Sequence, residues 1–202
     1  MTYSTKHLPG EQRRASTIET VIELAAEQNP EEITTTAIAN RMGLSQGALF
    51  RHFPNKDAIL KGVINWVSER LLARVDKAIA EAGTPLEALE AVFMTHIGFV
   101  ASHPGAPRML FGELQRSRVT PAKKMARVFI ASYRDRIEGI LEQGKAEGDL
   151  DAGLDSKAAA TMFVGIIQGL VMQSLLTGSM EKMHESASGV FRIYRRGIVS
   201  AS

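Results

Sequence analysis

The stretch from Thr34 to Lys56, TTTAIANRMGLSQGALFRHFPNK, decides the fold because its spacing predicts two short helices joined by a tight turn. Ala39 provides the small residue that is needed where two helices cross closely. Gly43 allows the backbone to reverse direction between them, and Leu49 provides an apolar anchor for the second helix. This spacing predicts a helix-turn-helix.

Helical spacing of apolar residues continues outward from this stretch along nearly the whole chain, without strand-like alternation. Thr34 and Ser45 are predicted to cap the two short helices, and a long helix is predicted from about Lys56 to Glu81. We therefore predict an all-α fold of about nine helices. Residues 1–56 would form a three-helix head, and residues 57–202 a helical body.

Composition restricts the chemistry that the chain can perform. The 202 residues contain no cysteine, which excludes disulfides and thiolate chemistry and fits a cytoplasmic location. The net charge is only +2, so bulk charge does not predict nucleic-acid binding. After an acidic start, however, Arg41, Arg51, His52, Lys56 and Lys61 follow with Asp57 as the one acid among them, which allows a local basic face.

The segment from Ala158 to Leu176 is about long enough and apolar enough to cross a bilayer. A helix that is apolar nearly all round is placed either in lipid or inside a protein. Because the segment also carries Thr161, Gln168 and Gln173, we expect it to be buried in protein and expect no membrane partner.

The quoted stretch resembles the DNA-binding head of the tetracycline-repressor (TetR/AcrR) family. The similarity covers Thr-x-x-x-Ile-Ala, then Gly-Leu-Ser-x-Gly-x-Leu, and then an aromatic residue followed by x-His-Phe-x-x-Lys. The resemblance implies nine helices, with a variable ligand-binding body after the head. Two positions depart from the family pattern: Phe50 stands where the family usually has Tyr, and Ala37 where it often has an acid.

The resemblance also implies which residues contact DNA. Ser45 to His52 would form the recognition helix in the major groove. The implied contacts are Gln46, Gly47, Ala48 and Arg51 with base edges, Phe50 and His52 with the backbone or the head itself, and Thr34, Thr35 and Lys56 with phosphates. The chemistry agrees, since Arg pairs with guanine, Gln with adenine, and helix N-termini with phosphate.

One short recognition helix contacts few base pairs, so such heads usually work in pairs on palindromic half-sites. We therefore expect a homodimer through the last two helices. Gly165 and Gly169 share one helical face and allow a close helix approach, whereas the alternative is that these helices fill a monomer core. The predicted interface comprises Gly165, Gly169, Met183, Ala187, Val190, Phe191 and Tyr194.

Methionine and aromatic residues concentrate in the body, and such side chains line adaptable apolar pockets. The same side chains at helical spacing also suit an ordinary core. The predicted lining residues of an effector pocket are Trp66, Phe93, Met94, His96, Phe99, Met109, Phe111, Gln115, Phe129, Tyr133, Gln168 and Met172.

Together these features predict a ligand-responsive regulator, in the first instance a repressor, that binds a palindromic DNA operator as a dimer and releases it when a small, largely apolar effector binds. An enzyme is not expected, because no His-x-x-x-His pair or phosphate-binding glycine loop is present, and we expect no cofactor or metal. The alternative is a ligand-independent nucleoid or scaffold protein with the same head.

Overall fold

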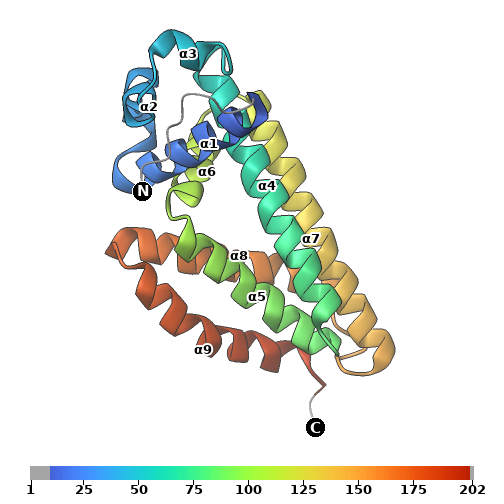
Figure 1. The fold of residues 1–202 in the computed structure, drawn as a ribbon. Helices are drawn as coiled ribbons and strands as arrows, with labels where there is room; N and C mark the ends of the chain where they lie inside the picture. Colours follow the sequence, from blue (N-terminus) through green and yellow to red (C-terminus); the bar gives the residue numbers. More distant parts are fainter. Residues whose placement is uncertain (1–9, 201–202) are drawn as a thin grey trace. The chain divides into compact units, whose positions relative to one another are not determined.

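The computed structural model describes residues 10–200, and all regular structure in that range is helical. This confirms the predicted all-α class with nine α-helices (Figure 1). The elements are α1 (Gly10–Glu27), the 3-10 turn η2 (Pro30–Glu32), α2 (Thr35–Arg41), α3 (Gln46–Phe50), α4 (Lys56–Glu81), α5 (Pro85–Ser102), α6 (Gly105–Gln115), α7 (Pro121–Glu147), α8 (Ser156–Thr177) and α9 (Met180–Ile198).

The described chain divides into two compact units, and each takes part of α4 and part of α7. The N-terminal unit comprises residues 10–69 and 103–127, and the C-terminal unit comprises residues 70–102 and 128–200. The first unit therefore extends beyond the head of residues 1–56 expected from sequence, because it also contains the first half of α4, all of α6 and the start of α7.

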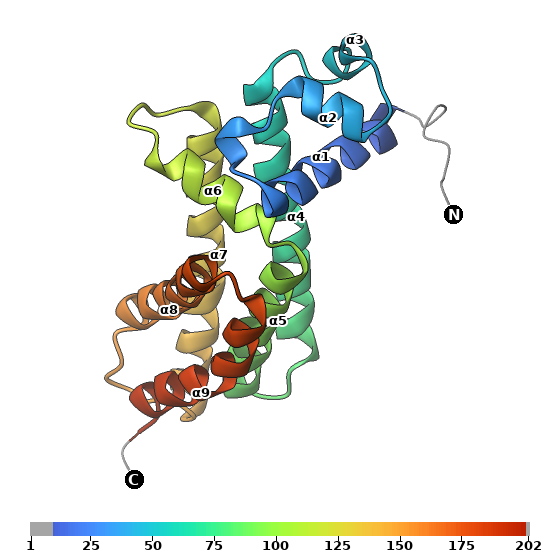
Figure 2. The same cartoon turned by 90° about the vertical axis from the view of Figure 1, so that its left-hand side faces the viewer.

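In the N-terminal unit, α6 packs closely against α1 (Figure 2). Gly105 makes this approach possible, since a Cβ there would lie 1.9 Å from the carbonyl oxygen of Ile22. The Arg108 guanidinium then donates to the carbonyl of Ala26 at 3.2 Å, near the C-terminal end of α1. A helix C-terminus leaves carbonyls without intrahelical partners, so this contact both caps α1 and fixes α6 on it.

The C-terminal unit has an aromatic core made by α5, α8 and α9. The Phe93 ring lies 5.5 Å from that of Phe163 and 5.3 Å from that of Phe191, between ring centroids. Tyr194 is also buried, and its hydroxyl donates to the carbonyl of Ala159 at 3.1 Å, which satisfies the one polar group of this cluster.

Helix α8 is long and apolar enough to cross a membrane by length and composition alone. One of its faces packs inside the C-terminal unit through Ala160 and Phe163. The other face leaves Met162, Met172 and Leu176 exposed, so the expectation of burial holds within this chain for one face only.

Candidate nucleic-acid interface

The two helices of the predicted motif are each capped as their sequence requires. The Thr34 hydroxyl accepts from the amide of Ala37 at 3.0 Å at the start of α2, and the Ser45 hydroxyl accepts from the amide of Ala48 at 3.2 Å at the start of α3. Gly43 has φ +64°, a left-handed conformation that glycine adopts without strain. The helix-turn-helix is thus formed as predicted.

The recognition helix presents its polar face to solvent and buries Leu49 beneath it. The predicted DNA contacts that are exposed are Thr34, Ser45, Gln46, Gly47, Phe50, Arg51 and Lys56, while Thr35, Ala48 and His52 are partly exposed. Phe50 is 41% exposed, which is unusual for a large aromatic side chain. The predicted contacts thus form an accessible surface.

The Gln46 side chain is hydrogen-bonded to a residue of the neighbouring helix α2. Its side-chain amide donates to the Thr35 hydroxyl at 2.8 Å, which joins α3 to the first turn of α2. Both residues were predicted as DNA contacts. The bond fixes the orientation of the Gln46 amide and leaves its oxygen and second N–H for a base edge.

Lys56, a predicted phosphate contact, also makes hydrogen bonds within the N-terminal unit. Its ammonium donates to the carbonyl of Glu31 at 2.9 Å and lies 3.4 Å from that of Pro30, so it closes η2 onto the start of α4. Partial burial lowers the pKa of Lys56 from its usual value, and the nearby Arg116 lowers it further. Lys56 therefore has a structural role in addition to its predicted phosphate contact.

Arg14 is a residue that the sequence did not reveal. Its guanidinium donates to the carbonyl of His52 at 2.6 Å, and its Cζ atom lies 4.7 Å from the centre of the Phe53 ring. The contact joins α1 to the turn that follows the recognition helix. No local pattern marks Arg14, because its partners lie 38 and more residues further along the chain.

An ion-pair chain joins the end of α6 to the start of α4 inside the N-terminal unit. Glu113 is buried and accepts from the hydroxyl of Thr120, and its carboxylate lies 3.2 Å from Nε of Arg116. Arg116 in turn lies 3.7 Å from Asp57 in the first turn of α4. A cleft beside this chain is lined in part by Ile33, Lys56 and Arg116, so the N-cap side of α2, the start of α4 and the end of α6 meet there.

The predicted effector-pocket residues are distributed over both units. Trp66, Met109, Phe111 and Gln115 belong to the N-terminal unit, and the other eight belong to the C-terminal unit. In the latter, three of the predicted residues do meet: Nδ1 of His96 lies 3.1 Å from the Tyr133 hydroxyl, and the Tyr133 ring lies 6.5 Å from that of Phe129. Gln168 and Met172 are exposed on α8.

Burial shifts both members of the His96–Tyr133 pair toward their neutral forms. It lowers the pKa of His96 to about 4 and raises the pKa of Tyr133 well above its usual value. At neutral pH the pair is therefore an uncharged hydrogen-bonding site within a largely apolar interior.

The predicted dimer interface needs revision. Met183, Ala187, Phe191 and Tyr194 are at most 2% exposed within a single chain, so they present no area to a second copy. Their helical stripe indicated burial correctly, but the burying partners are α5 and α8 of the same chain. Of the apolar and small residues on α8 and α9, Met162, Gly165, Met172, Leu176 and Ile193 are exposed, and Gly169 and Val190 are partly exposed.

A capped helix-turn-helix with an exposed recognition helix defines the class of the protein as DNA-binding. Residues 18–63 match the family described as bacterial regulatory proteins, tetR family, and residues 116–190 match the tetracyclin repressor-like C-terminal domain. The chain belongs to the TetR family of DNA-binding regulators, which confirms the resemblance seen in the sequence, and it is a regulator rather than an enzyme.

The chain is similar to one group of proteins in sequence and to a second group in fold. The nucleoid occlusion factor SlmA of Marinomonas sp. (strain MWYL1) is 30% identical over 168 residues, which cover 79% of this chain and 81% of the relative. FadR of Bacillus halodurans, a fatty acid degradation regulator, has a TM-score of 0.83 at 19% identity, with 96% of this chain and 98% of that chain covered. FadR of Bacillus subtilis, solved in complex with stearoyl-CoA, has a TM-score of 0.81 at 23% identity, with coverages of 91% and 98%.

Proposed function

We propose that the protein is a cytoplasmic, homodimeric transcriptional regulator that binds a palindromic operator and releases it when a small, largely apolar effector binds the C-terminal unit. The observation that carries this proposal is the exposed apolar and small-residue face of α8 and α9. On α8, Met162, Gly165, Gly169, Met172 and Leu176 follow each other at spacings of three and four residues, so they share one face.

This face supports a dimer because water-exposed apolar stripes of this kind usually mark interaction surfaces. The two glycines allow a partner helix to approach closely, and Ile193 on α9 is 68% exposed. Two α8–α9 pairs packed together would form a four-helix bundle, and the dimer would present two recognition helices to successive major grooves.

The direct test of operator binding is selection of binding sites from a library of random duplexes with the purified protein. We expect an inverted repeat of two half-sites. Arg51→Ala should relax preference at one base-pair position of each half-site, at a cost of about 1–3 kcal/mol. Enrichment of single, unpaired half-sites would contradict the dimer, and no enrichment would contradict sequence-specific binding.

For the effector, the His96–Tyr133 pair offers the polar group that an apolar pocket uses to orient its ligand. The complex of Bacillus subtilis FadR with stearoyl-CoA motivates the first probes, stearoyl-CoA and free stearate. Binding of either should weaken operator binding, and operator should weaken its binding by the same factor. Equal ligand affinity with and without operator would contradict the proposed coupling.

The similarity to SlmA favours a second candidate, in which the same dimer acts as a nucleoid-associated protein without an effector. Genome-wide mapping of bound sites in the native host separates the two. A regulator should occupy a few sites in front of genes, whereas a nucleoid factor should occupy many sites spread over the chromosome irrespective of promoters.

A further inference from the structure

The cations of the N-terminal unit are concentrated outside its helix-turn-helix. Residues 1–69 contain seven Lys and Arg against eight Asp and Glu, whereas residues 103–127 contain six Lys and Arg against Glu113 alone. Binding to duplex DNA depends mainly on basic side chains that replace the counterions of the phosphates. The excess positive charge of the unit therefore comes entirely from the segment that contains α6 and the start of α7.

Three of these cations are free to bind a ligand. Arg118 in the α6–α7 loop and Lys124 and Arg127 on α7 are exposed, and among the described residues none of the three has a hydrogen-bond or ion-pair partner. Lys124 and Arg127 are three residues apart and share a helix face. We call these three residues the α7 basic patch.

Two of the other three cations of the same stretch, Arg116 and Lys123, hold the loop in place. The Lys123 ammonium donates to the carbonyls of Leu114 and Arg116, at 2.8 and 2.6 Å, and Arg116 pairs with buried Glu113. The Thr120 hydroxyl caps α7 by accepting from the Lys123 amide at 3.0 Å. Because the loop is fixed at both ends, little backbone entropy is lost when the α7 basic patch binds an anion.

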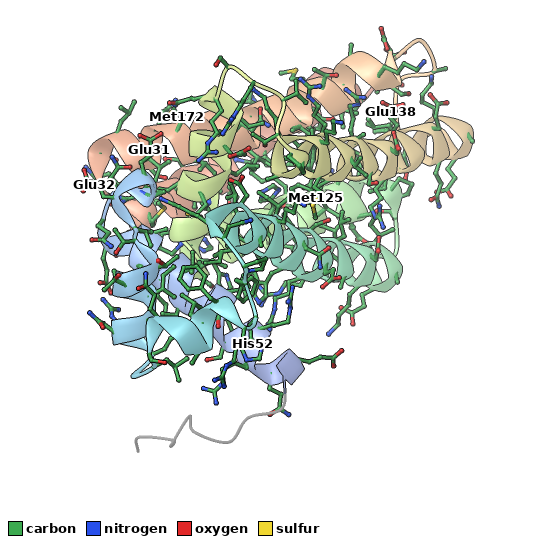
Figure 3. All side chains as sticks on the ribbon, turned by 90° about the horizontal axis from the view of Figure 1, so that it is seen from above. Glu31, Glu32, His52, Met125, Glu138 and Met172 are labelled. Atoms are coloured by element: carbon green, nitrogen blue, oxygen red, sulfur yellow. The ribbon has the colours of Figure 1, made fainter. Side chains whose placement is uncertain are left out.

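The patch follows in sequence directly after a residue that lies near the predicted phosphate contacts of the head. Arg116, two residues before Arg118, lies 3.7 Å from Asp57 and lines the same cleft as Lys56 and Ile33, the residue before Thr34. Helix α6, from which this loop leaves, packs against η2 in the same unit (Figure 2). Figure 3 shows Glu31 and Glu32 far from His52 within this unit, and Glu31 lines the cleft together with Lys56 and Arg116.

We infer that the α7 basic patch is a second DNA-binding site, which contacts duplex phosphates next to those held by the start of α2 and the start of α4. It would add sequence-independent affinity to a head that is itself close to neutral. Duplex DNA is the fitting occupant because three exposed cations suit a phosphate backbone, and the unit already belongs to a DNA-binding protein. This inference rests on DNA binding by the family and not on the proposed effector.

The test is a salt titration of DNA binding. A fluorescein-labelled 40-base-pair duplex of fixed mixed sequence is titrated by fluorescence anisotropy at several KCl concentrations, with wild type and with the triple variant Arg118→Gln, Lys124→Gln, Arg127→Gln. The plot of log affinity against log salt should become shallower by about 0.9 for each phosphate that the variant no longer neutralises, summed over both protomers. A decrease of at least two in the slope of the dimer is the expected result.

The matched control is the triple variant Lys77→Gln, Arg134→Gln, Lys157→Gln, which removes the same charge from exposed sites of the C-terminal unit. It should keep the wild-type slope, and circular dichroism melting should show both variants folded. If both variants lower the slope equally, only net charge matters and the inference is wrong.

Exposed Val119 provides a further check, because it lies beside the α7 basic patch and is 51% exposed. Val119→Ser should leave DNA binding unchanged if the patch binds phosphates. A patch for an acidic protein segment would instead use Val119 and leave the salt slope of the triple variant at the wild-type value. If the wild type binds DNA and the patch triple variant shows the same salt slope, this inference is wrong while the proposed function stands.

Discussion

The two units of this protein differ in the contacts that stand out within them and in the surfaces that they present. In the N-terminal unit, charged side chains close the structure by binding backbone carbonyls, as Arg14, Lys56, Arg108 and Lys123 do. In the C-terminal unit, an aromatic core centred on Phe93 fills the interior. An apolar stripe of Met162, Met172, Leu176 and Ile193 remains exposed on α8 and α9.

This difference indicates which partner each unit suits. A surface of capped helix ends, hydroxyls and cations suits a polyanion, and its affinity should depend strongly on salt. A surface of methionine, leucine, isoleucine and glycine suits another apolar surface, and its affinity should depend on buried area and hardly on salt. Each prediction below tests one side of this contrast, starting with the largest expected effect.

A charge in the apolar stripe should separate the dimer. Ile193→Glu would bury an unpaired carboxylate at the proposed interface, which costs several kcal/mol for each copy. Because the side chain is 68% exposed within one chain, the fold itself should tolerate the change. Light scattering coupled to size-exclusion chromatography should show a folded monomer, and binding to the selected operator should fall at least 100-fold.

Val128→Glu is the matched control for that experiment. Val128 is 66% exposed, almost as much as Ile193, but it lies on α7 and not on the α8–α9 face. It should remain dimeric. If Ile193→Glu also remains dimeric at micromolar concentration, the exposed stripe is not the interface.

Truncation of the aromatic core should cost more stability than any change on the DNA-binding surface. Phe93→Ala removes a fully buried ring and should lower the free energy of unfolding by about 3–5 kcal/mol. Phe50→Ala, at a 41% exposed ring of the same type, should change it by less than about 1 kcal/mol. Urea denaturation followed by circular dichroism measures both, and equal losses would contradict the difference in packing between the two sites.

The buried His96 makes stability depend on pH. Its pKa is about 4 in the folded protein and near 6.5 when exposed, so the unfolded chain binds the proton first as pH falls. Neutral His96 therefore contributes fully to the free energy of unfolding above about pH 6.5. This contribution is lost progressively as the pH falls toward 4, and the total loss is roughly 3 kcal/mol at 1.36 kcal/mol per pKa unit. His96→Gln should flatten this part of the stability profile, while His184→Gln, at an exposed position, should not.

The sequence predicted the helix-turn-helix because its signals are local. Thr34, Gly43 and Ser45 act on residues within four positions of themselves, so a short stretch contains both the cap and its partner. The stripe on α9 was also a correct indication of burial. However, periodicity shows that a face is covered and not which chain covers it, which is why Met183 and Phe191 were assigned to the wrong partner.

The contacts that the sequence could not reveal join residues far apart in the chain. Lys56 binds carbonyls 25 and 26 residues earlier, and Arg136 binds Asp76 60 residues earlier. The position of a cation in the sequence does not show whether it will bind a backbone carbonyl, an acid or DNA. Only its surroundings in the folded unit make that distinction, as they do between anchored Lys123 and free Lys124.

Substitution of Arg14 should give the smallest of the expected effects on operator affinity, and it tests how the recognition helix is positioned. Because its guanidinium holds the His52 carbonyl and stacks on Phe53, we expect it to position the C-terminal end of the recognition helix. Arg14→Lys keeps the charge but loses the planar group that makes both contacts, at a cost of about 0.5–1.5 kcal/mol. Binding to the selected operator should fall about three- to tenfold, and the preference over the mixed-sequence duplex should fall with it.

Salt dependence separates positioning from direct contact in this case. A positioning residue changes affinity for the operator without changing the number of phosphates contacted, so the salt slope of Arg14→Lys and of Arg14→Gln should stay at the wild-type value. Arg74→Lys is the matched control, since Arg74 stacks on Phe99 at 5.2 Å in the C-terminal unit and should not affect DNA binding. A slope reduced by about two per dimer in Arg14→Gln would show that Arg14 binds phosphate itself, and the cation-rich surface would then extend from α7 to the start of α1.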